Sequence, residues 1–456
     1  MGDYLFNDFP SVGSKEWKNK IQVDLHGKDY NETLIAKLNE GISIKPFYHS
    51  DNFKQITIPN TPSSYKICQT IFINDEKKAY NIANESLRRG ANAIRFIALQ
   101  PFDIDGLFEN IISHSRDESP DIYFQLHFLD EKFLNRLTEK NWGVNLFLNI
   151  DIIGNLVKTG NWFKNDKQDH QSLFSILKKS KKNISVVSID ASQYQNAGAN
   201  IIQQVAYSLA HANEYLNYFG EALGAQINFN FSVGPNYFLE IAKLRAVRHL
   251  WDLLLATYDL EIEANIFVEP GLRNKSLYDY NSNMLRTTTE CMSAVLGGAN
   301  TISNVAYDTI FHRKNEFGER IARNQLILLK DESNLKNASF VEGTYYIEEL
   351  TYEIAERALD LFKNIEKSGG FVKQLFEGTI QRKIAESASR EQEQFDKGEL
   401  VILGTNKYKN DSDKMKESMD LYPFLRTQNK ETVIEPVIAK RLAEEMEKER
   451  LNSETI

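Results

Sequence analysis

Cysteine is almost absent from this chain of 456 residues, which has only Cys68 and Cys291. Two cysteines cannot form the disulfide framework of a small secreted protein, and their scarcity fits a reducing cytoplasm. The eight histidines form no His-x-x-x-His pair, and no Cys-x-x-Cys pair occurs. These spacings argue against a protein-bound metal. We expect both thiols to lie in the core.

Long apolar runs and an excess of positive charge are also missing. No stretch of eighteen apolar residues occurs, so we expect no membrane-spanning segment. The N-terminus, Met-Gly-Asp-Tyr-Leu-Phe-Asn-Asp, lacks the basic-then-apolar pattern of a signal peptide. The net charge of −9 disfavours nucleic acid and anionic membranes as partners. These absences together predict a cytoplasmic protein.

Eight short β-rich runs alternate with helical stretches between about residues 65 and 310, a pattern typical of βαβ units and a parallel sheet. Eight such units predict a (β/α)8 barrel of the TIM type. A doubly wound open sheet is the second candidate, but no Gly-x-Gly-x-x-Gly follows the first strand. The predicted strands are Gln69–Ile73, Ala93–Ala98, Ile122–Phe128, Val144–Ile150, Ile184–Ile189, Gln226–Phe231, Asn265–Glu269 and Ala299–Ser303.

The barrel is expected to occupy residues 46–310, between an N-terminal arm (1–45) and a helical C-terminal region (311–456). The arm is polar and broken by glycine and proline, with one predicted helix at 30–39. In the C-terminal region, a helix at 348–368 should stop at Gly369-Gly370. The last helix is expected at 436–451, with Glu444 and Lys448 paired on a solvated face.

Polar residues alternate with apolar ones inside several predicted strands. Strands wrapped by helices present apolar side chains outward, so the alternate positions should face the barrel axis. Their bulk predicts an axis closed by hydrogen-bonded packing rather than an open channel. The residues expected to face the axis are Tyr123, Gln125, His127, Asn145, Phe147, Asn149, Asn228 and Asn230.

Three carboxylates, Asp151, Asp190 and Glu269, fall at the C-terminal ends of predicted strands, where barrel enzymes keep catalytic groups. Such a pair could act as general acid and base in a glycosidase-like hydrolase. The alternative is that they cap the following helices or accept hydrogen bonds from loop amides. Their spacing in the sequence does not decide between the two.

Several collinear blocks resemble the methylmalonyl-CoA mutase family over almost the whole chain. Residues Ser188–Asn200 (Ser-Ile-Asp-Ala-Ser-Gln-Tyr-Gln-Asn-Ala-Gly-Ala-Asn) are similar to the family segment after the fifth barrel strand. Asn283–Asn300 contains an Arg-Thr-Thr-x-Glu-like run that leads to the eighth strand. The other blocks are Phe238–Trp251, Ile321–Asn324, Gly343–Glu348, Gly369-Gly370 and Gly404–Tyr408. The resemblance implies the same barrel.

The departures from the family pattern all indicate that this chain has lost the catalytic function of the family. The position of the family's catalytic His is Gln193, and the position of its Arg is Cys68. Glutamine carries no titratable proton. The family's His-x-Gln-Thr-Ser-Gly block is replaced by Phe267–Gly271. The only near match to the cobalamin motif Asp-x-His-x-x-Gly is Asp24–Asp29, which lacks the final Gly. We therefore predict no catalytic, cofactor or metal residues and no cobalamin-binding domain.

The resemblance thus implies a structural, non-catalytic small chain that works with a catalytic large subunit. In such a pair the large subunit binds adenosylcobalamin and interconverts (R)-methylmalonyl-CoA and succinyl-CoA, and this chain binds no cofactor. Self-association of the isolated chain is a further prediction. Two alternatives stay open. One is a catalytic acyl-CoA mutase barrel that uses a cobalamin-binding chain in trans. The other is an unrelated barrel hydrolase with Asp151, Asp190 and Glu269.

Overall fold

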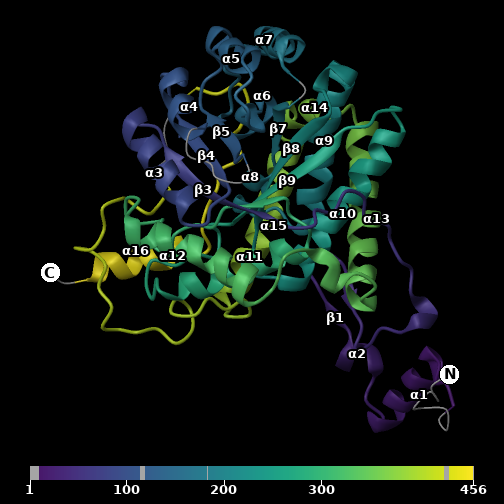
Figure 1. The fold of residues 1–456 in the computed structure, drawn as a ribbon. Coiled ribbons are helices and arrows are strands. Elements are labelled where there is room, and N and C mark those ends of the chain that lie inside the picture. Colours follow the sequence, from purple (N-terminus) through teal and green to yellow (C-terminus); the bar gives the residue numbers. More distant parts are fainter. Residues whose placement is uncertain (1–9, 113–118, 182, 426–430, 455–456) are drawn as a thin grey trace, which may run out of the picture.

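A computed structural model of the protein describes residues 10–112, 119–181, 183–425 and 431–454. Its centre is a closed barrel of eight parallel strands in the order β10-β3-β4-β5-β6-β7-β8-β9 (Figure 1). The predicted (β/α)8 fold is confirmed, and all eight predicted runs contribute a strand. The strands are β3 (Lys66–Phe72), β4 (Ala93–Ala98), β5 (Asp121–Leu126), β6 (Leu146–Ile150), β7 (Ile184–Asp190), β8 (Gln226–Val233), β9 (Glu263–Pro270) and β10 (Thr301–Ile302).

Helices follow the strands and cover the outside of the barrel. They begin where Asp or Asn side chains accept hydrogen bonds from amides of the first turn, as Asp75, Asp130, Asn165 and Asn200 do. The helices are α3 (Glu76–Arg88), α4 (Ile104–Ile112), α5 (Glu131–Glu139), α6 (Ile152–Thr159), α7 (Asp166–Lys179), α8 (Ser192–Asn196), α9 (Ile201–Phe219), α10 (Tyr237–Ala256) and α11 (Ser282–Leu296). No helix in the described ranges is long and apolar enough to cross a membrane.

The C-terminal region packs against the barrel and its helices at several places rather than forming a separate body (Figure 1). Its helices are α12 (Glu316–Ile327), α13 (Tyr345–Lys367), α14 (Phe371–Phe376), α15 (Thr379–Asp396) and α16 (Glu444–Ser453). Helix α13 lies across α9 and α10, where Arg245 Nη2 and Glu348 Oε1 form a buried ion pair of 2.6 Å. The helix expected at 348–368 is therefore present.

The last helix differs from the prediction. It begins at Glu444 rather than at Pro436, because the preceding segment runs extended along the barrel and donates Val433 N and Val437 N to carbonyls of Gly160 and Val157. Glu444 is buried and accepts hydrogen bonds from the backbone N–H groups of Leu425 and Arg441. Lys448 pairs with Glu445 instead. The expected solvated pair of Glu444 and Lys448 is wrong, because Glu444 caps a buried chain segment.

The N-terminal arm projects away from the barrel (Figure 1). Its first helix, α1 (Ser14–Asp24), has no buried residue, and Trp17 is 52% exposed. The predicted helix at 30–39 is only α2 (Tyr30–Leu34), because the chain then forms the hairpin β1 (Ala36–Lys37) and β2 (Ser43–Ile44). Gly41, with φ of +77°, permits this tight hairpin turn.

The barrel axis is filled by side chains from seven of the eight strands. Tyr123 stacks on Phe147 with ring centroids 4.2 Å apart, and it contacts Phe267 at 4.9 Å. Its hydroxyl group is 2.9 Å from Thr301 Oγ1 and accepts a hydrogen bond from Asn265 Nδ2. Together with Cys68 of β3 and Ala93 of β4, the three rings form a buried cluster at the level of the middle of the strands.

A chain of amides completes the filling of the axis. Asn265 Nδ2 donates to Asn228 Oδ1, and Asn228 Nδ2 donates to both Asn149 and Asn230. Asn149 adopts φ of +47° at a register shift between β6 and β7, which is a bulge that turns its side chain toward this network. The expectation for Tyr123, Phe147, Asn149, Asn228 and Asn230 thus agrees with their contacts.

Three other residues expected at the axis lie nearer to the barrel ends. Asn145 precedes β6, is exposed and donates to Asp121 Oδ1. His127 follows β5 and is exposed, and Gln125 is half-buried. Strands β5 and β6 are shorter than the alternation of polar and apolar residues suggested, which explains the difference for Asn145 and His127.

Candidate functional site

The C-terminal ends of the strands form one mouth of the barrel, where barrel enzymes carry their chemistry. An ion pair between Arg95 Nη2 of β4 and Glu269 Oε2 of β9, 2.5 Å long, lies across it. Arg95 Nε donates to Thr70 Oγ1, and its guanidinium group lies over the Phe267 ring. Thr70 Oγ1 is 2.9 Å from Ser303 Oγ. In these contacts the polar groups of the mouth bind one another.

Lys314 extends this network from the loop before α12. Its Nζ donates to Thr70 O at 2.6 Å and lies 3.7 Å from Glu319 Oε1. Gln69 of β3 then hydrogen-bonds to both Glu319 and Arg323 of α12. The first strand and the C-terminal region are therefore joined at the mouth by charged groups that sequence reasoning did not identify. Arg95 and Lys314 belong to no recognised sequence motif, so they could not be identified from the sequence. Only the closure of the barrel brings them together with Glu269.

Asp151 caps α6 and is saturated with hydrogen bonds. Its carboxylate accepts from Gly154 N, Asp190 N, His211 Nε2 and the Tyr215 hydroxyl group, all at 2.7–2.9 Å. Burial pushes the pKa of Asp151 up, but His211 and these hydrogen bonds outweigh it, and the pKa is lowered. The side chain acts as a helix cap and the centre of a buried network, which is the capping role considered in the sequence analysis.

Asp190 is the opposite case, although it is only one strand away. It ends β7 and accepts a hydrogen bond of 2.5 Å from Ser192 Oγ. Burial raises the pKa of Asp190, and Asp151 and Glu269 raise it further, while Lys158 and Ser192 lower it. The pKa of Asp190 is thus raised above its usual value, whereas that of Asp151 is lowered. Asp190, Asp151 and Glu269 each have dedicated protein partners in this mouth.

Cys68 and Gln193 occupy the positions at which the family resemblance places an Arg and a catalytic His. Cys68 lies in β3 within the axial cluster, and burial raises the pKa of its thiol to about 12. Such a thiol stays protonated and unreactive at neutral pH. Gln193 lies in α8 and is 8% exposed. Neither of its amide atoms makes a hydrogen bond of good geometry, although the Tyr194 hydroxyl group is close enough to interact with it.

The near-motif for cobalamin binding lies outside the barrel. His26, the histidine of the near-motif Asp24–Asp29, lies on the projecting arm just after α1, and Asp24 is paired with Lys20 at 2.6 Å. Both are exposed, and helix α1, which ends at Asp24, lies away from the barrel (Figure 1). Within the described ranges, no group of three His, Cys, Asp or Glu side chains could hold a metal ion. Cys68 and Cys291 are free and buried, in agreement with the sequence analysis.

The sequence profile of methylmalonyl-CoA mutase matches residues 144–453, which is more than half of the chain. The chain belongs to the methylmalonyl-CoA mutase family. It is 28% identical to the methylmalonyl-CoA mutase small subunit of Porphyromonas gingivalis over 99% of this chain and 78% of that protein. It is 35% identical to the methylmalonyl-CoA mutase of Cereibacter sphaeroides over 49% of this chain and 33% of that protein.

Against the mutases of other bacteria, the match covers about half of this chain. The chain spans about a third of the length of the mutases of Cereibacter sphaeroides and Escherichia coli. The family resemblance proposed from the sequence blocks is confirmed. Among solved structures, the dihydropteroate synthase of Yersinia pestis aligns over 62% of this chain with a TM-score of 0.32 and 11% identity, which adds nothing to the assignment.

Proposed function

We propose that this chain is the small, non-catalytic subunit of a methylmalonyl-CoA mutase. The assembled enzyme would interconvert (R)-methylmalonyl-CoA and succinyl-CoA. One observation carries the non-catalytic role: the axis and mouth of the barrel are filled by side chains that bind one another. Tyr123, Phe147 and Phe267 block the middle, and the pair of Arg95 and Glu269 crosses the mouth. An acyl-CoA arm would need this space.

The proposed partner is a large subunit that binds adenosylcobalamin and acyl-CoA. The similarity to a protein named as a small subunit supports this pairing. So does the projecting arm, since a helix with no buried residue gains nothing from the barrel and leaves Trp17 available to another surface. The apolar residues Leu5, Phe6 and Phe9, also expected to contact the partner, lie outside the described residues. We expect an interface above about 2,000 Å² in total.

Location in the cytoplasm is part of the proposal. The two buried, unpaired thiols are compatible with a reducing compartment. Self-association of the isolated chain through the face that binds the large subunit remains a second proposal. It follows from the likeness of the two subunits in the family, and sedimentation of the purified chain at increasing concentration would test it.

Co-expression with a large subunit of the same family tests the function. The expected result is a stable heterodimer in which the large subunit retains adenosylcobalamin through gel filtration and the complex isomerises methylmalonyl-CoA. The chain alone should bind no cobalamin and have no activity. Activity of this chain with an isolated cobalamin-binding module would instead establish a catalytic barrel working in trans and would overturn the non-catalytic role.

Gln193→His tests whether the loss of the catalytic His is enough to explain inactivity. We expect no turnover by this variant, because the axis stays filled and no cofactor binds. Gln195→His, two residues along the same helix, is the matched control for the introduction of an imidazole. Activity in the Gln193 variant alone would refute the proposal that the filled axis abolishes catalysis.

A further inference from the structure

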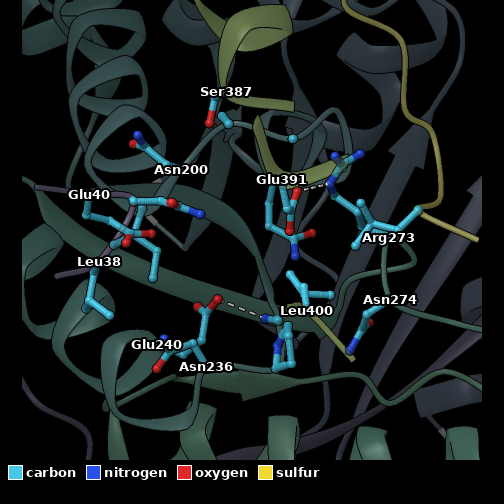
Figure 2. A pocket seen from close by; sticks show the side chains of 18 of the residues that line it. Leu38, Glu40, Asn200, Asn236, Glu240, Arg273, Asn274, Ser387, Glu391 and Leu400 are labelled. Atoms are coloured by element: carbon cyan, nitrogen blue, oxygen red, sulfur yellow. Dashed lines mark hydrogen bonds and ion pairs between the residues drawn. The ribbon is translucent and has the colours of Figure 1, made fainter. Parts of the chain in front are cut away.

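Two of the cavities outside the barrel axis differ in the charges of their walls. The first, of about 750 Å³, lies beside the mouth, and Figure 2 shows Glu240, Glu391 and Arg273 among the side chains that line it. Arg273 Nε donates to Glu391 Oε2 at 2.5 Å, and Glu240 forms an ion pair with Lys243. Carboxylates and cations are thus mixed around this cavity, which favours neither sign of ligand charge.

The second cavity, of about 430 Å³, lies between the N-terminal arm and the start of α13. Helix α1, the start of α2, residues 45–54 and the first turns of α13 enclose it. The ring of Phe53 packs on that of Tyr345 with centroids 4.9 Å apart, which closes the side toward α13. Its volume is within the usual range of small-molecule sites.

Positive charge dominates the wall of this second cavity, although the whole chain has a net charge of −9. Among the described residues, the wall holds four lysines and the carboxylate of Glu349 alone. Lys45 Nζ pairs with Glu349 Oε1 at 2.7 Å, so this carboxylate is already used. The other three lysines form no ion pair with a carboxylate of the described residues; they are Lys15, Lys18 and Lys54.

Aromatic rings, rather than carboxylates, contact two of these lysines. Lys18 Nζ lies 4.8 Å from the centroid of the Tyr30 ring, and Lys54 Nζ lies 4.6 Å from that of Tyr352. A ring face attracts an ammonium group without neutralising its charge. The three unpaired lysines are exposed, however, and solvent screens each of them. Their grouping alone does not define a site.

Tyr30 provides a second, independent observation. It lines the cavity and is only 8% exposed, yet its hydroxyl group forms no hydrogen bond with any residue that the structure describes. Burial raises the pKa of Tyr30, although the charge of Lys45 lowers it in part, so the phenol stays protonated at neutral pH. Tyr30 therefore offers the cavity an O–H donor that no protein acceptor uses.

The unused groups of this cavity are donors, and this decides the class of ligand. Ammonium groups and a phenol suit oxyanions, and lysine is a common ligand of phosphate. A phosphate group carries about −1.5 to −2 charges at pH 7 and three acceptor oxygens, more than a single carboxylate does. The N-terminus of α1 takes no part, because the N–H groups of Gly13 and Ser14 already bind Glu16 and Asp51.

We propose that this cavity binds a small molecule with two linked phosphate groups, held by Lys15, Lys18 and the hydroxyl group of Tyr30. Two linked phosphates match the charge of the three unpaired ammonium groups more closely than one phosphate does. The site lies apart from the barrel axis and does not depend on the subunit role proposed above.

Calorimetric titration of the full chain with inorganic pyrophosphate tests the site. Succinate is the control for a dianion without phosphate, and butane-1,4-diamine is the cationic control. Pyrophosphate should bind more tightly than succinate, and Lys18→Gln should weaken its binding about tenfold, because one charged contact is lost. Lys37→Gln removes the same charge from an exposed position of β1 outside the cavity and should leave the dissociation constant unchanged.

Tyr30→Phe removes only the hydroxyl group and should weaken pyrophosphate binding about fivefold. Lys15→Gln, at an exposed residue, should weaken it about tenfold and keeps the proposal testable if the Tyr30 variant perturbs the arm. Thermal unfolding of each variant checks that the fold is intact. Equal binding of succinate and pyrophosphate, binding of the diamine, equal loss in Lys37→Gln, or no binding of any probe would overturn the proposal.

Discussion

The barrel and the N-terminal arm differ in where their side chains find partners. In the barrel, even the polar residues of the axis satisfy one another, as Asn228 does with Asn149, Asn230 and Asn265. In the arm, α1 buries no residue, and its ion pair between Lys20 and Asp24 lies in solvent. The polar side chains of the barrel axis thus bind one another, whereas the side chains of α1 stay exposed and can contact another protein.

The largest effect is expected inside the barrel, for Tyr123→Ala. This change removes a fully buried ring that stacks on Phe147 and leaves Asn265 and Thr301 without the phenol. We expect a loss of about 3–5 kcal/mol in the free energy of unfolding, measured by urea denaturation. Tyr218→Ala, at an exposed tyrosine on α9, is the matched control. Equal losses for the two would mean that the axis is not the stable centre of the fold.

Asp151→Asn should have the next largest effect, a loss of about 1–3 kcal/mol, because charge-assisted hydrogen bonds of a buried network are weakened. The lowered pKa of Asp151 means that its stabilisation is present above its ordinary pKa. That contribution is lost as the pH falls through the folded-state value. The difference in thermal stability between wild type and variant should therefore be constant from pH 7 down to the ordinary pKa of Asp151 and should shrink only below it.

Asp190→Asn should have a smaller effect of the opposite sign, a gain of less than about 1 kcal/mol at pH 7. Because the folded-state pKa of Asp190 is raised, its ionised form costs stability at neutral pH, and protonation relieves that cost as the pH falls. Between the ordinary pKa of an aspartate and neutral pH, the stability of the variant should depend less on pH than that of the wild type. A loss of stability at pH 7 as large as that of Asp151→Asn would contradict this difference between the two carboxylates.

The smallest effect on stability is expected from deletion of residues 1–28, which removes α1 and keeps the buried Tyr30. The free energy of unfolding of the isolated chain should change by less than about 0.5 kcal/mol, since no core contact is lost. Binding to the large subunit, measured by pull-down or interferometry, should weaken at least about tenfold. Trp17→Ala is the point variant for the same test. Unchanged binding would show that the arm is not part of the interface.

The sequence alone predicted the barrel, because eight β-rich runs alternate with helical stretches and no Gly-x-Gly-x-x-Gly follows the first run, which disfavours an open doubly wound sheet. It also predicted much of the axis, since Tyr123, Phe147 and Asn228 follow a period of two. The sequence also indicated the family and showed that Gln193 stands at the position of the family's catalytic His. At Asn145, one residue before the start of β6, the same alternation was misleading, because a period of two does not indicate where the hydrogen bonding of a strand begins or ends.

Only the tertiary structure decided which charges meet. Arg95 pairs with Glu269 across 174 positions of sequence because closing the barrel brings β4 and β9 around one axis. Asp151 and Asp190 look alike in sequence, but His211 and Tyr215, on a helix sixty positions later, saturate only the first. The β1–β2 hairpin is likewise held by residues distant in sequence, through the hydrogen bonds between Asn39 and Gln394 of α15. Electrostatic environment depends on distances through space, which no local pattern encodes.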